Sequence, residues 1–280
     1  MKQRTVLSVV ITFAALCVAT QAQLDAQETS TQATKNPTAV SLASNALTAM
    51  TGGVAISDVT LSAQVTRTVG SDSESGAATL EALSAGDASL SYSLGGGQRA
   101  EIINPTSSSR GAWSGSDGAW HKMALHNSWT PAAWFAPTLV LEAALVDPQL
   151  SIENLGSTII DGEAVTHLRV WRVLPSISGS PATLALIQGL STVDIYLDAT
   201  SNLPVALDFN LHPDSNAGVN IPVEVRYSNW QRSSGALMPF HIQKFLNGSL
   251  LDDISVSSAT VNRGLSSSTF DVPATSGGAQ

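Results

Sequence analysis

Apolar and polar residues alternate along most of this chain, most regularly between residues 193 and 261. A period of two is typical of half-buried β-strands. The strands that it predicts in this region cover residues 192–197, 204–211, 223–232, 237–246 and 250–261. Asn247 and Gly248 separate the last two runs, and both residues tolerate the positive φ of a tight hairpin turn. The last third of the chain therefore predicts consecutive antiparallel strands.

The same alternation continues upstream, with turns of Gly, Asp and Ser between the runs. The strands that it predicts there cover residues 55–68, 76–83, 88–94, 99–104, 112–114, 119–123, 150–160 and 164–173. Residues 174–189, which contain a cluster of Ser, Gly and Pro, predict instead a loop with a short apolar segment. About twelve strands joined by short turns are too many for one flat sheet, so we expect the sheet to curl.

Two segments have helical rather than strand periodicity. Residues 38–50 carry an apolar stripe and end at Gly52 and Gly53, which favours a short amphipathic helix. Residues 138–146 follow Pro137 and are almost entirely apolar, so we expect a helix that is buried on most sides and acts as a plug or lid. The predicted fold class is mainly β (α+β): an open antiparallel half-barrel of about 11–12 strands closed by short helices.

The N-terminus has the features of an export signal. Lys2 and Arg4 precede an apolar run, which small residues follow. We predict a signal peptide over residues 1–22 and hence a periplasmic or secreted protein, with an uncleaved membrane anchor as the alternative. Lipid attachment at Cys17 is disfavoured, because Leu16 precedes it where a small residue is required. The remaining predicted organisation is a disordered leader over residues 23–37, a single β domain over residues 38–272 and a flexible tail over residues 273–280.

Removal of the signal peptide leaves an acidic chain. Lys2 and Arg4 are lost from 13 basic residues while all 22 acidic residues remain, so the net charge becomes 11 − 22 = −11. This charge disfavours binding to nucleic acid or to anionic lipid surfaces. The only cysteine, Cys17, is also lost, which excludes disulfides, thiolate metal sites and cysteine nucleophiles from the mature chain.

Three features of the C-terminal half form a recognisable series. Residues 194–204 end in Asp-Ala-Thr-Ser-Asn-Leu-Pro, residues 224–242 contain a strand followed by Gly-Ala-Leu-Met-Pro, and Asn262 follows the last long strand. This series resembles that of LolA-like proteins, with Asn202 where their turn usually has Gly. The family includes periplasmic lipoprotein carriers and sensors of cell-envelope stress. The resemblance implies an open antiparallel half-barrel of roughly eleven strands with helices closing its mouth.

Catalytic and metal-binding motifs are not evident. The five histidines are scattered and include no His-Glu-x-x-His, and no Gly-x-Ser-x-Gly is present. Asp252 and Asp253 follow a hairpin turn, where charges usually meet solvent. We therefore expect a protein that is not an enzyme, with no catalytic residue, no metal site and no cofactor. A metal site assembled from residues distant in sequence remains the alternative.

Aromatic and aliphatic residues around the predicted lid are the better candidates. They are expected either to line an apolar cavity or to seal one end of the barrel as core residues. The predicted ligand-binding residues are Trp129, Trp134, Phe135, Leu139, Leu141, Leu145 and Trp171.

The predicted function is that of an exported, non-catalytic binding protein. Its partner is expected to be a lipid, a lipoprotein acyl chain or another apolar or amphipathic ligand, with peripheral membrane contact at most. The alternative is a periplasmic protein-interaction or sensor module that binds an envelope protein without lipid.

Overall fold

The computed structural model describes residues 32–174 and 179–275. The predicted signal peptide, most of the predicted leader and the end of the predicted tail lie outside these ranges. Within them, every helix falls short of the length and apolar character that crossing a membrane requires.

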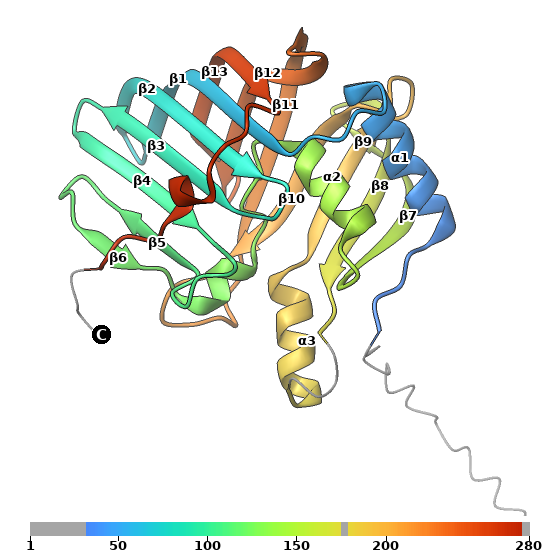
Figure 1. The fold of residues 1–280 in the computed structure, drawn as a ribbon, viewed down its shortest axis with the longest axis horizontal. Helices are drawn as coiled ribbons and strands as arrows, with labels where there is room; N and C mark the ends of the chain where they lie inside the picture. The colour runs from blue at the N-terminus through green and yellow to red at the C-terminus, as the bar shows by residue number, and fades with distance from the viewer. Residues whose placement is uncertain (1–31, 175–178, 276–280) are drawn as a thin grey trace, which may run out of the picture.

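The described chain forms one sheet of thirteen strands (Figure 1). The strands are β1 (Asp58–Val69), β2 (Asp72–Leu83), β3 (Ala88–Leu94), β4 (Gly97–Ile103), β5 (Gly111–Ser114), β6 (Trp120–Lys122), β7 (Leu150–Ile160), β8 (Glu163–Arg172), β9 (Val193–Asp198), β10 (Pro204–Leu211), β11 (Ile221–Ser233), β12 (Ala236–Leu246) and β13 (Ser249–Val261). Their spatial order is β6-β5-β4-β3-β2-β1-β13-β12-β11-β10-β9-β8-β7, and neighbours pair antiparallel. The predicted meander is confirmed.

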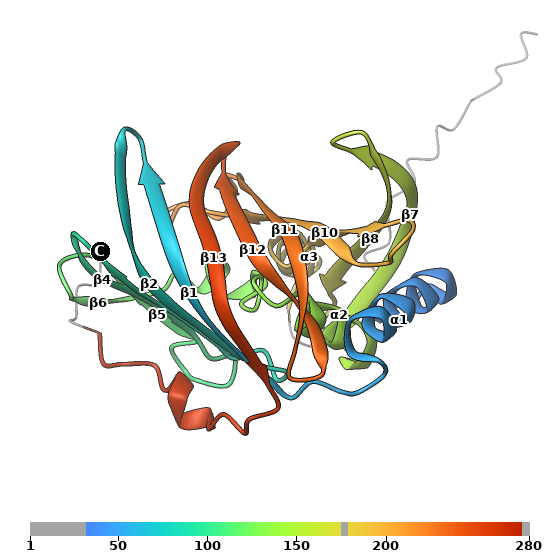
Figure 2. The same cartoon turned by 90° about the horizontal axis from the view of Figure 1, so that it is seen from above.

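The sheet is open, because β6 and β7 are its two edges. The chain passes from one edge to the other through residues 123–149, which contain η1 (Leu125–Trp129) and α2 (Pro137–Val146). Figure 2 shows the sheet bent into two arms, with α2 between them. The predicted open half-barrel is thus confirmed, and the connection between its edges places α2 on the inner side.

Both predicted helices are present, and a third was missed. α1 (Pro37–Thr51) begins where Asn36 Oδ1 accepts a hydrogen bond from the Ala39 N–H at 3.0 Å, and it ends at Gly52 with φ 64°. α3 (Pro181–Leu190) occupies most of the region predicted as a loop. That prediction was wrong because the Ser-Pro pair that looked like loop chemistry is also a helix start: Ser180 Oγ accepts from the Thr183 N–H at 3.2 Å.

The end of the predicted leader packs against the sheet. The N–H of Asn36 donates to the carbonyl of Ile152, and the N–H of Ile152 donates to that of Thr34, both at 3.0 Å. The Lys35 ammonium donates to the carbonyls of Ala144 and Asp147 at the C-terminus of α2. The cation lies at the negative end of the helix dipole, which stabilises the position of α2.

The two ends of the sheet domain are joined beside β1. Asn262, at φ 54°, accepts hydrogen bonds from the N–H and hydroxyl of Ser57 at 2.7 and 3.0 Å. The Asp58 carboxylate accepts from the N–H groups of Arg263 and Gly264 at 2.8 and 2.9 Å. The asparagine of the LolA-like pattern therefore has a structural role here: it ties the end of β13 to the start of β1.

Candidate functional site

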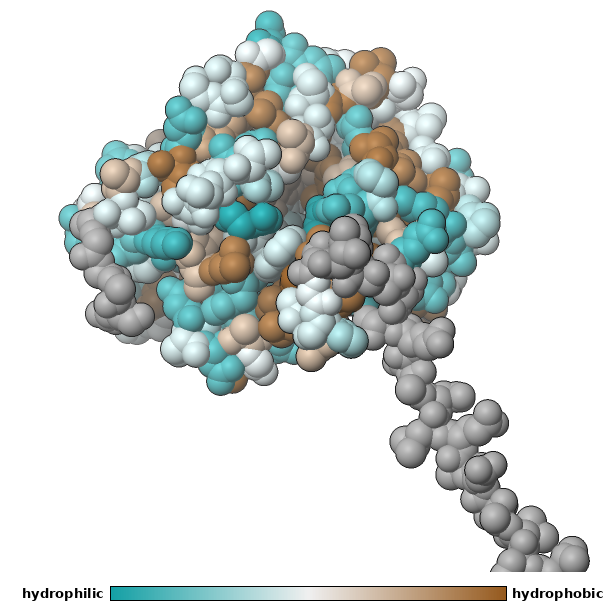
Figure 3. All heavy atoms as spheres, turned by 60° about the horizontal axis from the view of Figure 1, so that its bottom comes forward, coloured by the Kyte–Doolittle hydropathy of each residue, from teal (hydrophilic) through white to brown (hydrophobic). Residues whose placement is uncertain are grey.

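A cavity of about 620 Å³ lies between α2, η1, the starts of β7 and β9, the end of β8 and the β2–β3 turn. This volume falls within the range of about 300–1,000 Å³ that small-molecule sites occupy. Its lining residues are Leu83, Ser84, Ala85, Gly86, Ile103, Pro105, Arg110, Ser128, Trp129, Thr130, Pro131, Ala132, Ala133, Leu139, Val140, Ala143, Val146, Asp147, Gln149, Leu150, Val170, Arg172, Leu174, Ser191 and Val193. Figure 3 shows apolar and polar residues side by side around the hollow on this side of the molecule.

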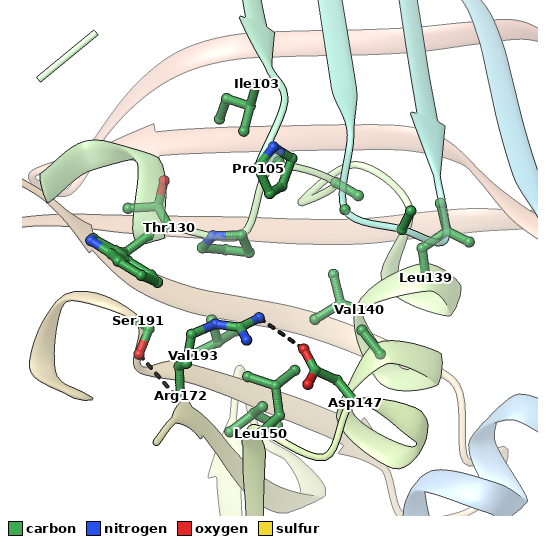
Figure 4. Close-up of a pocket in the computed structure, with 18 of the residues that line it drawn as sticks. Ile103, Pro105, Thr130, Leu139, Val140, Asp147, Leu150, Arg172, Ser191 and Val193 are labelled. Atoms are coloured by element: carbon green, nitrogen blue, oxygen red, sulfur yellow. Dashed lines mark hydrogen bonds and ion pairs between the residues drawn. The ribbon is translucent and has the colours of Figure 1, made fainter. Parts of the chain in front are cut away.

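The apolar wall comes from α2 and from the strands opposite it (Figure 4). Leu139, Val140 and Ala143 line the cavity from the helix. Val170 and Val193 line it from β8 and β9, and they are 3% and 5% exposed. An almost wholly apolar helix can present aliphatic side chains both to the core and to a cavity, which explains why α2 carries so few polar residues.

One side of the cavity carries an ion pair. Nη2 of Arg172 lies 3.0 Å from Oδ2 of Asp147, and its Nη1 donates to Gln149 Oε1 at 3.0 Å. Oδ1 of Asp147 accepts from the N–H of Gln149 at 2.8 Å. Ser191 Oγ accepts from the backbone N–H of Arg172 at 2.9 Å. The charges of Asp147 and Arg172 therefore satisfy each other.

Arg110 provides a second cation to the lining of the cavity. Its Nε donates to Ser128 Oγ at 3.0 Å, and its guanidinium carbon lies 4.4 Å from the centroid of the Trp129 ring. Burial lowers the pKa of Arg110, and the nearby Arg172 charge lowers it further. Within the described chain, the terminal nitrogens of Arg110 have no hydrogen-bond or ion-pair partner.

The residues predicted from the sequence fall into four groups, of which Trp171 alone forms the last. Trp129 and Leu139 line the cavity. Trp134, Phe135 and Leu141 are buried in the core, with exposed fractions of 3%, 0% and 0%. Leu145 lines a separate hollow of about 200 Å³ between α1 and α2.

Trp171 lies outside the lining of the cavity, although it stands between two residues that belong to the lining. Val170 and Arg172 line the cavity while Trp171 does not. Side chains of a strand alternate between the two faces, so residues 170 and 172 share a face that residue 171 cannot reach.

Trp134 covers a polar part of the barrel interior. The Lys244 Nζ lies 4.3 Å from the centroid of the Trp134 ring. Asp252 on β13 lies opposite Lys244 on β12 in the strand register, and its Oδ1 lies 2.7 Å from Nη1 of Arg67. The Tyr92 hydroxyl is buried and has no hydrogen-bond partner among the described residues. Trp134 and its neighbours therefore seal a partly polar interior.

The arrangement of titratable residues offers no metal site in the described ranges, where no three His, Asp or Glu side chains gather in a way that holds a metal ion. His167 instead lies 2.8 Å from Asp194, and His241 lies 2.7 Å from Asp253. Asp194 also accepts two hydrogen bonds from Arg169, and the Nδ1 of His241 lies 3.0 Å from Ser228 Oγ, so these histidines belong to hydrogen-bond networks on the sheet, which favours a structural role.

Sequence reasoning missed the polar residues of the cavity, above all Arg110, Asp147 and Arg172. A signal was available for Arg172, because the alternation of β8 places it on the same face as Val170. No comparable signal exists for Arg110, which lies in the loop between β4 and β5 and meets Ser128 and Trp129 only in the folded chain.

No family model matches the chain, and no curated protein matches it either. Solved structures do match the chain. A domain described as an outer membrane lipoprotein-sorting protein from Vibrio parahaemolyticus is 10% identical, with a TM-score of 0.51, over 84% of this chain and 96% of that one. A LolA superfamily protein from Nitrosomonas europaea is 12% identical, with a TM-score of 0.46, over 83% and 96%.

At such low identity the likeness concerns the fold alone. The open thirteen-stranded sheet, the helices on its inner side and the likeness to the Vibrio domain agree with one another. The described chain has a LolA-like fold.

Proposed function

We propose that this protein is an exported, non-catalytic binding protein that holds a lipid, a lipoprotein acyl chain or another apolar ligand in its half-barrel. The single observation that carries the proposal is the cavity of about 620 Å³ lined mainly by aliphatic side chains. Each buried methylene contributes on the order of 0.8 kcal/mol, so one acyl chain would supply several kcal/mol of binding free energy. Binding alone, without a reaction, accounts for the cavity.

The fold and the N-terminal sequence support this proposal. The similar Vibrio domain is described as a lipoprotein-sorting protein, which is consistent with an acyl ligand. The predicted signal peptide, residues 1–22, is consistent with a periplasmic or secreted protein that meets such ligands outside the cytoplasm. α2 forms one wall of the cavity through Leu139 and Ala143, so movement of this helix would widen or narrow the entrance.

The test is binding of N-phenyl-1-naphthylamine, a neutral probe whose fluorescence rises in apolar surroundings. The folded protein should enhance its fluorescence, and Ala143→Phe should reduce the enhancement because the larger ring fills the cavity. Ala199→Phe, at an exposed turn position outside the lining, is the matched control and should behave like the wild type. The proposal would be refuted if folded wild-type protein did not enhance the fluorescence of the probe. Separately, mass spectrometry of organic extracts from the purified protein would identify a ligand that the cavity retains.

One observation favours a protein-interaction module as the second candidate. β7 is an edge of the sheet, and its distal half exposes Leu155 and Ile159 at 41% and 71%. An exposed edge with apolar side chains suits the addition of a strand from a partner. Loss of a co-purifying envelope protein in Ile159→Lys, with probe binding unchanged, would support this candidate.

A further inference from the structure

The lining of the cavity carries an unbalanced positive charge. The inference drawn from this charge rests on the proposed function. We propose that the cavity selects amphiphiles with a single anionic headgroup, a carboxylate or a phosphate, which the terminal nitrogens of Arg110 bind. The acyl chain then lies along the aliphatic wall of Val140 and Val170.

The charge balance of the lining is the first observation. Of the lining residues, only Arg110, Arg172 and Asp147 carry a full charge, so the sum is 2 − 1 = +1. Asp147 and Arg172 are paired at 3.0 Å. The charge left over therefore belongs to Arg110, in a chain whose formal net charge is −9.

The orientation of Arg110 is the second observation. Ser128 Oγ holds Nε, and the Trp129 ring lies against the guanidinium. Ser128 is 6% exposed and its hydroxyl donates to the carbonyl of Leu125 at 2.7 Å, so this support is itself fixed. Four N–H donors remain on Nη1 and Nη2, and one from each nitrogen forms the parallel pair that carboxylate and phosphate oxygens accept.

The backbone at Arg110 is the third observation. Its φ is 57°, in the left-handed region that costs a residue with a side chain on the order of 1 kcal/mol. Glycine would avoid this cost, yet the position holds a long cationic side chain. Strain of this kind is typical of residues that bind ligands.

The negative net charge of the protein limits which source can supply the anionic amphiphile. A net charge of −9 repels an anionic membrane surface, whereas Arg110 acts only within the cavity. A single amphiphile taken from solution or from a partner therefore suits the site, and docking on an anionic bilayer does not.

The experiment measures displacement of N-phenyl-1-naphthylamine by decanoate, decyl phosphate and decanol. The wild type should bind the two anions about tenfold or more tightly than the alcohol, because a bidentate guanidinium contact is charge-assisted. Arg110→Gln should remove this preference and leave decanol binding unchanged. Arg110→Gly should do the same while relieving the backbone strain, so a folding defect cannot explain the loss. Arg263→Gln, at an exposed position outside the lining, removes the same charge and should keep the preference.

The outcomes separate this inference from the proposed function. Equal binding of all three ligands, or a preference that survives Arg110→Gln, overturns the headgroup assignment and leaves the apolar cavity in place. If neither the probe nor any of the three ligands binds, both the headgroup assignment and the proposed function are overturned. Inorganic phosphate should not displace the probe or block decanoate at the same concentration, and blocking by it would identify a free-anion site instead.

Discussion

The ammonium of Lys244 lies 4.3 Å from the centroid of the Trp134 ring, inside the half-barrel. Lys244 belongs to β12 and Trp134 to the connection that crosses between the sheet edges, so this contact joins the sheet to the segment that covers it. In the described chain, Lys244 makes no hydrogen bond or ion pair in addition. The charges of Glu101 and Asp252 favour the ammonium form, but its desolvation by burial outweighs them and lowers the pKa of Lys244.

Lys244→Met should therefore stabilise the protein by about 1–3 kcal/mol at pH 7. Burial lowers the pKa of Lys244 in the folded state, so the unfolded state binds more protons in the window between that lowered value and 10.5. Wild-type stability should rise with pH through this window, and the advantage of the variant should shrink. Urea unfolding at several pH values measures this. Lys122→Met, at an exposed position, is the control, and a destabilised Lys244→Met would contradict the prediction.

Tyr227→Phe should loosen the covering segment. The Tyr227 hydroxyl donates to the carbonyl of Trp134, and Tyr227 is 4% exposed. Removing the donor leaves a buried carbonyl unpaired, which costs about 1–3 kcal/mol. Hydrogen exchange should become faster in residues 124–136 while the β1–β2 pair stays protected. If residues 124–136 exchange equally fast in the wild type and in Tyr227→Phe, this hydrogen bond does not hold the segment.

Asp208→Asn should stabilise the protein by an amount that grows as pH rises from about 3.8 and is complete above about 6. Asp208 pairs across the sheet with both Asp194 and Glu224. Burial, then the Glu224 charge, raises the pKa of Asp208 to about 6, so the folded state binds a proton that the unfolded state has lost. Ionised Asp208 thus costs stability above pH 6 and costs nothing below the ordinary pKa of 3.8.

The gain should be of the order of 1–2 kcal/mol at pH 7.5, after allowance for solvent screening, and should vanish near pH 4. Thermal unfolding at both pH values measures it. Asp72→Asn, at an exposed position, is the control. A gain that persists unchanged at pH 4 would mean that ionisation is not its cause.

Asp58→Asn should have the opposite pH dependence. Burial alone opposes ionisation of this carboxyl, but hydrogen bonds from Arg263, Gly264 and Ser57 outweigh it and lower its pKa. The resulting stability is present above pH 3.8 and is lost as pH falls through the lowered folded value. The variant should lose about 1–3 kcal/mol at pH 7 and approach the wild type in acid, as judged by thermal unfolding.

Much of the sheet follows from local sequence. β3 (Ala88–Leu94), β7 (Leu150–Ile160) and β10 (Pro204–Leu211) have the predicted bounds, because alternation and turn residues act over a few neighbouring positions. The Asn247–Gly248 turn has φ of 49° and 76° at its two residues, as a tight hairpin requires. α3 was missed because its first residues suit a loop and a helix start equally well.

The sequence by itself determined the strands, the turns between them, two of the helices and the open half-barrel that so many consecutive hairpins require. Only the tertiary structure decided which residues form the cavity, since Arg110, Trp129 and Arg172 are brought together by a connection that crosses between the sheet edges. It also decided that Trp134 and Phe135 are core residues while Trp129 lines the cavity. Periodicity records which side of its own element a residue occupies, whereas a cavity depends on the distances between elements far apart in the chain.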